Sequence, residues 1–347
     1  MKIFYKVLLV VVVVFTVLAF SGVLFAQGHS DDVFEHVRKA QEKHTSWLMG
    51  IEGVVGTAVG LDPNDRLAVK VFVEERRDAR IPNKLDEIPV DVVVTGKIYA
   101  LKPGEKPTPF PGRINSAARF PRPVPIGVST GHPEITAGTI GCRVTDGNSV
   151  YALSNNHVYA NENIAAIGDN VLQPGPYDGG RNPQDAIGTL FDFELIVFYN
   201  YVNPPNPIPT NTIDAAIALS DTNNLGNATP SNGYGKPKST TASAYAGMQV
   251  KKYGRTTALT QGKIYATNAT VDVQYDQGVA RFVGQIIITP GNFSAGGDSG
   301  SLIVKKDGKA SENNKPVGLL FAGSRTITVA NPINAVLSAF GVSVDGE

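Results

Sequence analysis

The sequence predicts a mostly β protein, with an all-β unit over residues 127–347 and a small α+β unit over residues 27–101. From residue 127 onward, short strand-like runs alternate with Gly, Asn, Asp and Pro turns, and no long helical pattern appears until the C-terminus. Prolines crowd residues 102–126, which is typical of an extended linker between the two units. At 347 residues, the chain is long enough for about two domains.

The first 26 residues resemble an export signal. Lys2 and Lys6 precede an apolar run from residue 7 to residue 25, and Ala26 follows that run. A basic start, an apolar stretch and a small residue are the parts of a secretory signal peptide. The run would be about 28 Å long as a helix, which is near the thickness of a bilayer core, so an uncleaved membrane anchor is the alternative.

Residues 31–49 have the apolar spacing of an amphipathic helix, and strand-like runs follow it. These runs cover residues 54–61, 67–73 and 90–96, and residues 81–88 are predicted to form a second, short helix. A helix on a small sheet makes a self-contained α+β unit.

Nine strand-like runs are predicted in the all-β unit, which reads as a barrel or a sandwich. They cover residues 138–144, 150–154, 186–198, 212–219, 249–253, 262–266, 279–288, 302–304 and 317–322, and a short helix over residues 331–340 closes the unit.

Charge and cysteine content exclude several classes of function. The chain has 31 basic and 31 acidic residues, so nothing favours a nucleic acid or an anionic membrane surface as a partner. Neither a cofactor nor a metal site is predicted. Cys142 is the single cysteine and cannot form an internal disulfide, so we expect it to be buried and unreactive.

The loop Gly296-Gly297-Asp298-Ser299-Gly300 lies between two predicted buried strands and is suited to present one hydroxyl, that of Ser299. Its small residues would let backbone N–H groups face a reacting oxyanion. An ordinary Gly-rich turn is the alternative interpretation. Serine becomes a nucleophile only with a neighbouring base, which the chain has to supply.

His157 is the predicted base, because it alone among the five histidines has a strand-like context in the all-β unit. A buried carboxylate would fix its tautomer. Asp214 in Ile213-Asp214-Ala215-Ala216-Ile217 is the first choice for this carboxylate and Asp185 the second, since a carboxylate at the mouth of a buried strand needs a partner.

The order His157, Asp214, Ser299 is that of chymotrypsin-like proteases. Together with Leu153-Ser154-Asn155-Asn156-His157-Val158 and Gly254-Arg255-Thr256-Thr257-Ala258-Leu259-Thr260-Gln261-Gly262, these motifs make the chain from residue 138 resemble a trypsin-like serine protease of the bacterial, disulfide-free, streptogrisin-like type.

This resemblance implies two six-stranded β-barrels and assigns roles to residues. His157 would be general base, Asp214 its orienter, and Ser299 the nucleophile, with an oxyanion hole formed by the N–H groups of Gly297 and Ser299. Substrate contacts would come from Phe293, six residues before the nucleophile, and from Phe321, Ala322 and Gly323, which would pair with extended peptide. Because Phe293 is not acidic, we expect an uncharged side chain at the cleaved position.

The sequence therefore predicts an exported serine endopeptidase that acts on peptides or proteins. The alternative is a catalytically silent protease-fold module that binds peptides. Residues 27–101 are either a pro-region, which could inhibit the protease domain within the same chain, or a permanent accessory domain.

Overall fold

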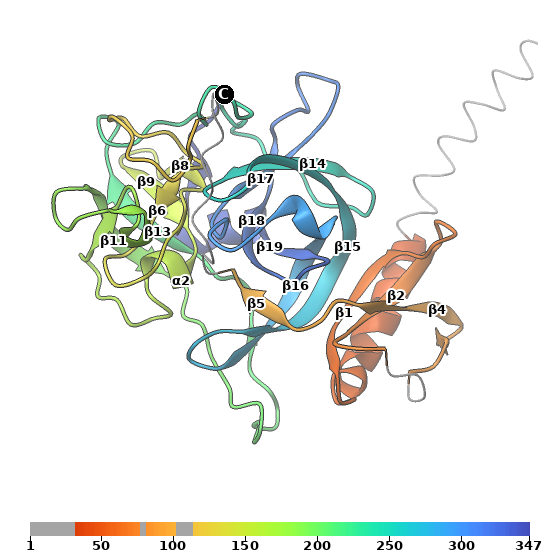
Figure 1. Ribbon diagram of the computed structural model, residues 1–347. Coiled ribbons are helices and arrows are strands. Elements are labelled where there is room, and N and C mark those ends of the chain that lie inside the picture. The colour runs from red at the N-terminus through yellow and green to blue at the C-terminus, as the bar shows by residue number, and fades with distance from the viewer. Residues whose placement is uncertain (1–31, 77–80, 102–113) are drawn as a thin grey trace, which may run out of the picture.

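The computed structural model describes residues 32–76, 81–101 and 114–347, and it consists mostly of β-strands (Figure 1). The described strands form a 12-stranded sheet, a 6-stranded sheet and a 2-stranded pair. The predicted signal or anchor, residues 1–26, lies outside the described residues. In the part of the chain that is described, no helix is long and apolar enough to cross a membrane.

The N-terminal unit consists of a helix packed on a small sheet. The predicted helix is present over residues 32–48, and it is followed by β1 (Val54–Leu61), β2 (Leu67–Val73), β3 (Lys84–Leu85) and β4 (Ile88–Val94). Val37 and Leu48 of the helix share one apolar cluster with Val59 of β1 and Val69 and Val71 of β2. The helix thus buries the face that its apolar spacing defines.

The predicted short helix over residues 81–88 is wrong. β3 and β4 form a hairpin there, with Leu85 opposite Ile88. Asp86 and Glu87 make the turn with φ values of 46° and 65°, and a right-handed helix cannot contain this left-handed conformation.

The 6-stranded sheet carries the first half of the all-β unit. In spatial order its strands are β10 (Asn170–Leu172), β11 (Ala186–Phe193), β13 (Ala216–Ser220), β9 (Val150–Ser154), β8 (Cys142–Thr145) and β20 (Ser343–Val344). The one-turn helix α2 (Asn156–Tyr159) follows β9 directly. The separate pair is β6 (Ser129–Thr130) with β7 (Gly138–Thr139). Short 3-10 turns cover Pro176–Asp178 and Gly291–Phe293.

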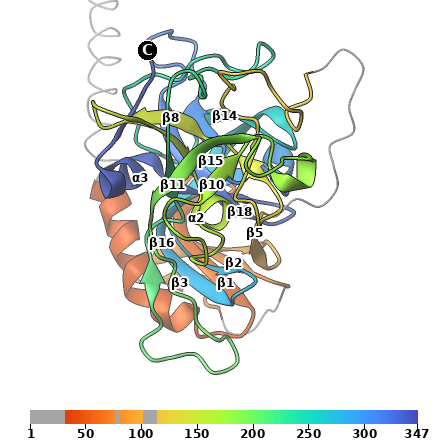
Figure 2. The ribbon, with the colours of Figure 1, turned by 90° about the vertical axis from the view of Figure 1, so that its left-hand side faces the viewer.

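The 12-stranded sheet joins the second half of the all-β unit to the N-terminal unit (Figure 2). Its order is β12 (Thr210–Asn211), β16 (Val279–Thr289), β19 (Thr328–Pro332), β18 (Pro316–Gly323), β17 (Leu302–Lys305), β14 (Gln249–Gly254), β15 (Ala258–Gln274), β1, β2, β4 and β3, and β5 (Ile98–Ala100) pairs with β15 and β18. The helix α3 (Ile333–Phe340) follows β19.

At the junction of the two units, where β1 pairs with β15, Gly56 faces Val271, and a Cβ on Gly56 would come within 2.9 Å of the Thr270 carbonyl oxygen. Glycine therefore permits this close approach of the two strands.

The mostly β class is confirmed, since each of the nine predicted runs contains a strand and the predicted C-terminal helix corresponds to α3. The division of these strands into two six-stranded barrels stays a prediction. Of the predicted linker, residues 102–113 lie outside the described part. Val124 and Ile126 in its remainder are buried in the core around the 6-stranded sheet.

Candidate active site

His157 and Asp214 lie against each other in the interior. α2 presents His157 and the residues before β13 present Asp214, and the distance from His157 Nδ1 to Asp214 Oδ2 is 2.5 Å. Asp214 has no exposed surface, and His157 is 6% exposed. With Nδ1–H donated to the carboxylate, the imidazole keeps Nε2 as an acceptor.

Three further residues fix Asp214 in place. Tyr275 donates its hydroxyl to Asp214 Oδ2 at 2.9 Å, and the side-chain amides of Asn155 and Asn331 donate to the Asp214 carbonyl at 2.7 and 3.0 Å. Burial, followed by the charge of Asp214, raises the pKa of Tyr275 well above its ordinary value, so the phenol remains a donor. The Tyr275 hydroxyl and the His157 ring offset the cost of burying the Asp214 carboxylate, while the two amides hold its main chain.

Ser299 lies in the loop between β16 and β17, at a point where the two halves of the all-β unit meet. Gly297 and Gly300 on either side of it have φ values of 93° and 91°, which favour glycine. A Cβ on Gly300 would come within 2.3 Å of the Thr139 carbonyl oxygen. The Ser299 carbonyl in turn accepts the Thr139 N–H at 2.7 Å, so this close contact fixes the loop.

The side chain of Asp298 stabilises the same loop through buried polar contacts. Its carboxylate accepts the Thr256 N–H at 2.8 Å and the Thr257 hydroxyl at 2.7 Å. Lys252 Nζ lies 3.3 Å from Asp298 Oδ2, and both side chains are fully buried. Burial lowers the pKa of Lys252, while Asp298 opposes that shift. Thr256 and Thr257, which belong to a segment singled out in the sequence, thus support the loop that carries Ser299.

The hydroxyl of Ser299 does not reach His157. Its oxygen lies 3.2 Å from each of the main-chain carbonyl oxygens of Leu101 and Phe321, so its single proton points to one of them or is shared between them. The buried His157 Nε2 has no hydrogen-bond partner within the described residues. The predicted base is therefore held by Asp214 but forms no hydrogen bond with the predicted nucleophile.

The contact with Leu101 arises because β5 lies beside the site (Figure 1). β5 pairs antiparallel with the end of β18, with Ala100 opposite Ala322 and Tyr99 opposite Gly323. Leu101 N–H donates to the Phe321 carbonyl at 3.3 Å. Phe321 to Gly323, predicted to pair with extended peptide, thus pair with a segment of this chain.

The carbonyl of Leu101 accepts the Gly297 N–H at 2.9 Å. Gly297 is one of the two predicted oxyanion donors, so one such donor already binds a peptide carbonyl. Phe293 is fully buried in the apolar cluster of the second half, and the Leu101 side chain packs against the same cluster.

Asp185, the second choice for the orienting acid, lies elsewhere. Its carboxylate accepts hydrogen bonds from the Arg119 guanidinium at 2.6 and 2.8 Å, and this guanidinium lowers the pKa of Asp185.

Cys142 is fully buried, which raises the pKa of its thiol. No cluster of His, Cys, Asp or Glu suited to a metal ion occurs among the described residues.

Comparisons with known proteins give a family match and several structural likenesses. The family described as "Nal1 C-terminal domain" matches residues 238–330. No curated protein matches the chain. A glutamic acid specific serine protease is 23% identical, covering 64% of this chain and 100% of its own, with a TM-score of 0.44.

Two further solved structures are similar to this chain. Thermobifida fusca Protease A is 18% identical, covering 65% of this chain and 99% of its own, with a TM-score of 0.43. Nocardiopsis protease is 18% identical, covering 64% of this chain and 98% of its own, with a TM-score of 0.43. All three of these solved structures are described as proteases, and each is similar to about two thirds of this chain. No activity is assigned to this chain from that similarity.

Sequence reasoning missed the residues that complete this site. No sequence motif surrounds Tyr275, Asn331 or Lys252, and the residues that they contact lie far from them in the sequence. Asn155 lies inside the histidine motif, so its position two residues before His157 is a usable signal. Leu101 is the last residue of the N-terminal unit that the sequence predicts, and no sequence pattern indicates that it reaches Ser299.

Proposed function

We propose that this chain is an exported serine endopeptidase. The observation that carries the proposal is the buried pair of His157 and Asp214, joined at 2.5 Å and stabilised by Tyr275, in a unit that also presents Ser299 between Gly297 and Gly300. In this proposal residues 127–347 are the protease domain, built as two six-stranded barrels, and residues 102–126 link it to the pro-region-like residues 27–101. Residues 1–26 direct export.

Each residue has a definite task in the proposed reaction. Asp214 keeps the proton on His157 Nδ1, so that Nε2 can accept the Ser299 proton. Ser299 Oγ then attacks the peptide carbonyl and forms an acyl-enzyme, and His157 returns the proton to the leaving amine. The N–H groups of Gly297 and Ser299 stabilise the oxyanion. To start, the Ser299 hydroxyl has to turn from the Leu101 and Phe321 carbonyls toward Nε2.

The same proposal makes the N-terminal unit an intramolecular inhibitor. β5 covers the edge of β18 and Leu101 accepts hydrogen bonds from Gly297 and Ser299, so an external peptide cannot use these groups at the same time. Inhibition follows from direct competition for one strand edge.

Turnover of a peptide substrate by single and double variants tests the mechanism. His157→Ala and Ser299→Ala should each reduce kcat by several orders of magnitude, and the double variant should lose little more, because members of a triad act as a unit. If the reductions of kcat in the two single variants added up in the double variant, the two residues would not act in the same step.

A silent peptide-binding module is the second candidate, and the unpaired His157 Nε2 favours it within the described residues. It predicts that a peptide binds equally well to the wild type and to Ser299→Ala and is never cleaved. Cleavage by the wild type that disappears in Ser299→Ala would exclude this candidate.

A further inference from the structure

We propose that an acidic pocket beside His157 binds a lysine or arginine side chain of the substrate, at the first position after the cleaved bond. The pocket has a volume of about 130 Å³, and Glu134, Glu162 and Asp276 line it together with His157 and Leu101. This inference rests on the proposed endopeptidase function and adds to it a specificity on the leaving-group side of the bond.

His157 places this pocket on the leaving-group side of the proposed reaction. Asp214 occupies Nδ1 of the ring, so the opposite edge, which carries Nε2, is the one left to face a substrate. In the proposed mechanism Nε2 passes a proton to the leaving amine, so the residue that carries this amine has to lie beside the imidazole. Leu101, whose carbonyl accepts the Gly297 N–H on the acyl side, also lines the pocket and marks its boundary.

The same histidine indicates that the pocket takes a ligand. His157 is 6% exposed, and its buried Nε2 has no hydrogen-bond partner within the described residues. A buried polar atom without a partner costs free energy, and a ligand that supplies the missing partner removes that cost. Because the ring gives its Nδ1–H to Asp214, Nε2 is an acceptor and needs an N–H donor from the ligand.

Three carboxylates give the pocket its charge. Glu134 comes from the loop between β6 and β7, Glu162 from the segment after α2, and Asp276 from the turn between β15 and β16. The other described residues of the lining are uncharged, apart from His157. Carboxylates are negative at neutral pH, so the pocket attracts a lysine or arginine side chain and repels an aspartate or glutamate.

Glu162 is held in place by its surroundings, so its carboxylate is a fixed part of the pocket. The carboxylate accepts the Gln277 N–H at 3.1 Å, and the Gln277 side-chain amide donates to the Glu162 carbonyl at 2.5 Å. Asn161, Glu162 and Asn163 have φ values of 47°, 55° and 75°, which is a costly conformation for three successive non-glycine residues. Asn156 stabilises it, since its side chain bonds the amide oxygen and the N–H of Asn163 at 2.7 and 3.1 Å.

The open side of the pocket suits the length of a basic side chain. Glu134 and Asp276 are exposed, whereas Val158 is buried and Ile135 half-buried. A lysine or arginine side chain can therefore lay its methylene groups against the apolar residues and keep its charged end near the outer carboxylates.

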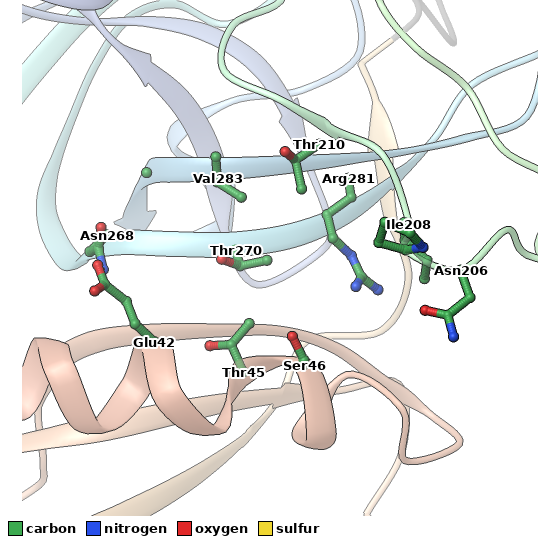
Figure 3. A pocket seen from close by; sticks show the side chains of 12 residues that line it. Glu42, Thr45, Ser46, Asn206, Ile208, Thr210, Asn268, Thr270, Arg281 and Val283 are labelled. Carbon is green, nitrogen blue, oxygen red and sulfur yellow. The ribbon is translucent and has the colours of Figure 1, made fainter.

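A larger pocket, of about 400 Å³, has a different character. Figure 3 shows Glu42 and Ser46 of the N-terminal helix across from Thr270 and Arg281. Both signs of charge line this pocket, and Arg281 already pairs with Asp272 at 2.8 Å. None of its described lining residues has a buried side-chain polar atom without a partner. The preference for a basic side chain is therefore assigned to the smaller pocket.

Quenched peptides that differ only at the first residue after the cleaved bond test the inference. For the wild-type full chain, kcat/KM per fluorophosphonate-reactive Ser299 should be about 10-fold higher with lysine than with norleucine, its neutral analogue. It should be about 100-fold higher with lysine than with glutamate. The ratio of lysine to norleucine should fall at about 0.5 M salt, because salt screens exposed charges. Equal rates for lysine and norleucine would overturn the inference.

Neutral variants identify the carboxylates that are responsible. Glu134→Gln should lower the ratio of lysine to norleucine about 3-fold, and the double variant with Asp276→Asn should remove most of the preference. Glu312→Gln is the matched control, because Glu312 pairs with Lys305 at the opposite end of β17 from Ser299, and it should leave the ratio unchanged. A lysine preference that persists in full in the double variant would overturn the assignment to this pocket.

A second readout needs no turnover and separates this inference from the proposed function. In the full chain with Ser299→Ala, n-butylammonium should shift the ring proton signals of His157 saturably, with a Kd in the millimolar range, whereas n-butanol should not. Glu134→Gln should weaken this binding.

The combined outcomes are distinct. Binding of n-butylammonium by a protein whose Ser299 never reacts with a fluorophosphonate would support the pocket and overturn the endopeptidase. Reaction of Ser299 without a preference for lysine and without binding of n-butylammonium would overturn this inference alone. A protein that neither binds the cation nor reacts would overturn both.

Discussion

At the scale of single residues, the account depends on Asp214 as the partner of His157. Asp214→Asn should keep the fold, since an amide can still accept from Tyr275, but it should reduce kcat about 10⁴-fold by favouring the wrong tautomer of the imidazole. Turnover of a peptide substrate measures this. Asp185→Asn is the matched control, because it breaks an ion pair with Arg119 and should leave kcat nearly unchanged. The reverse pattern would identify Asp185 as the acid.

Tyr275 makes a second residue-scale prediction. Tyr275→Phe removes the hydroxyl donated to the buried Asp214 carboxylate and leaves an acceptor without that partner. We expect a loss of about 1–3 kcal/mol in the free energy of unfolding, measured by urea denaturation. The exposed Tyr245→Phe serves as the control and should change it little. Equal stability of the two variants would mean that the phenol does not support Asp214.

At the scale of elements, the buried pair of Lys252 and Asp298 should determine whether the nucleophile loop forms. Lys252→Met leaves the Asp298 carboxylate buried without its cation, which typically costs about 3–5 kcal/mol. The urea midpoint should fall and Ser299 should lose its reactivity. Lys251→Met, on the same strand but partly exposed, should have little effect on either. A fully reactive Lys252→Met variant would show that the backbone and threonine donors alone hold the loop.

Elements with a clear local pattern were predictable from the sequence. β1 and β9 occupy the predicted residues because their apolar runs are bounded by turn residues. The hairpin over residues 81–88 was not predictable, because the left-handed turn at Asp86 and Glu87 has no strong sequence signal. β19, which supplies Asn331, was missed because it is short and ends in a proline.

The candidate site was predictable only where a motif marks it. His157, Asp214 and Ser299 each lie in a recognisable stretch, whereas Tyr275 and Asn331 meet Asp214 across 61 and 117 residues. Such contacts depend on strand order, which local pattern does not encode. The same holds for Leu101, whose contact with Ser299 spans 198 residues.

At the scale of the whole molecule, stability does not come from cross-links, since Cys142 is the single cysteine. Reducing agent should therefore leave the Tm and the activity unchanged. Burial raises the pKa of the Cys142 thiol, so at pH 8.5 the reactive thiolate stays scarce in the folded protein, and native chain should resist iodoacetamide. Denatured chain should react readily. Rapid alkylation of the native protein with loss of activity would place Cys142 at the site or at an interface.

The sheet that continues from β15 into β1 couples the N-terminal unit to the rest of the molecule. In this structure β5 occupies the β18 edge, and the Ser299 hydroxyl lies against the Leu101 and Phe321 carbonyls instead of His157. We expect the N-terminal unit to reduce activity for as long as it stays bound.

The central claim, that Ser299 is a nucleophile activated by His157, is tested most directly by covalent labelling. A fluorophosphonate should label the protein after the N-terminal unit has been released, with the label mapped to Ser299 by mass spectrometry. Ser299→Ala should abolish it, and His157→Ala should slow it by several orders of magnitude. A folded protein with a free groove that does not label, or that labels equally fast without His157, would contradict the account.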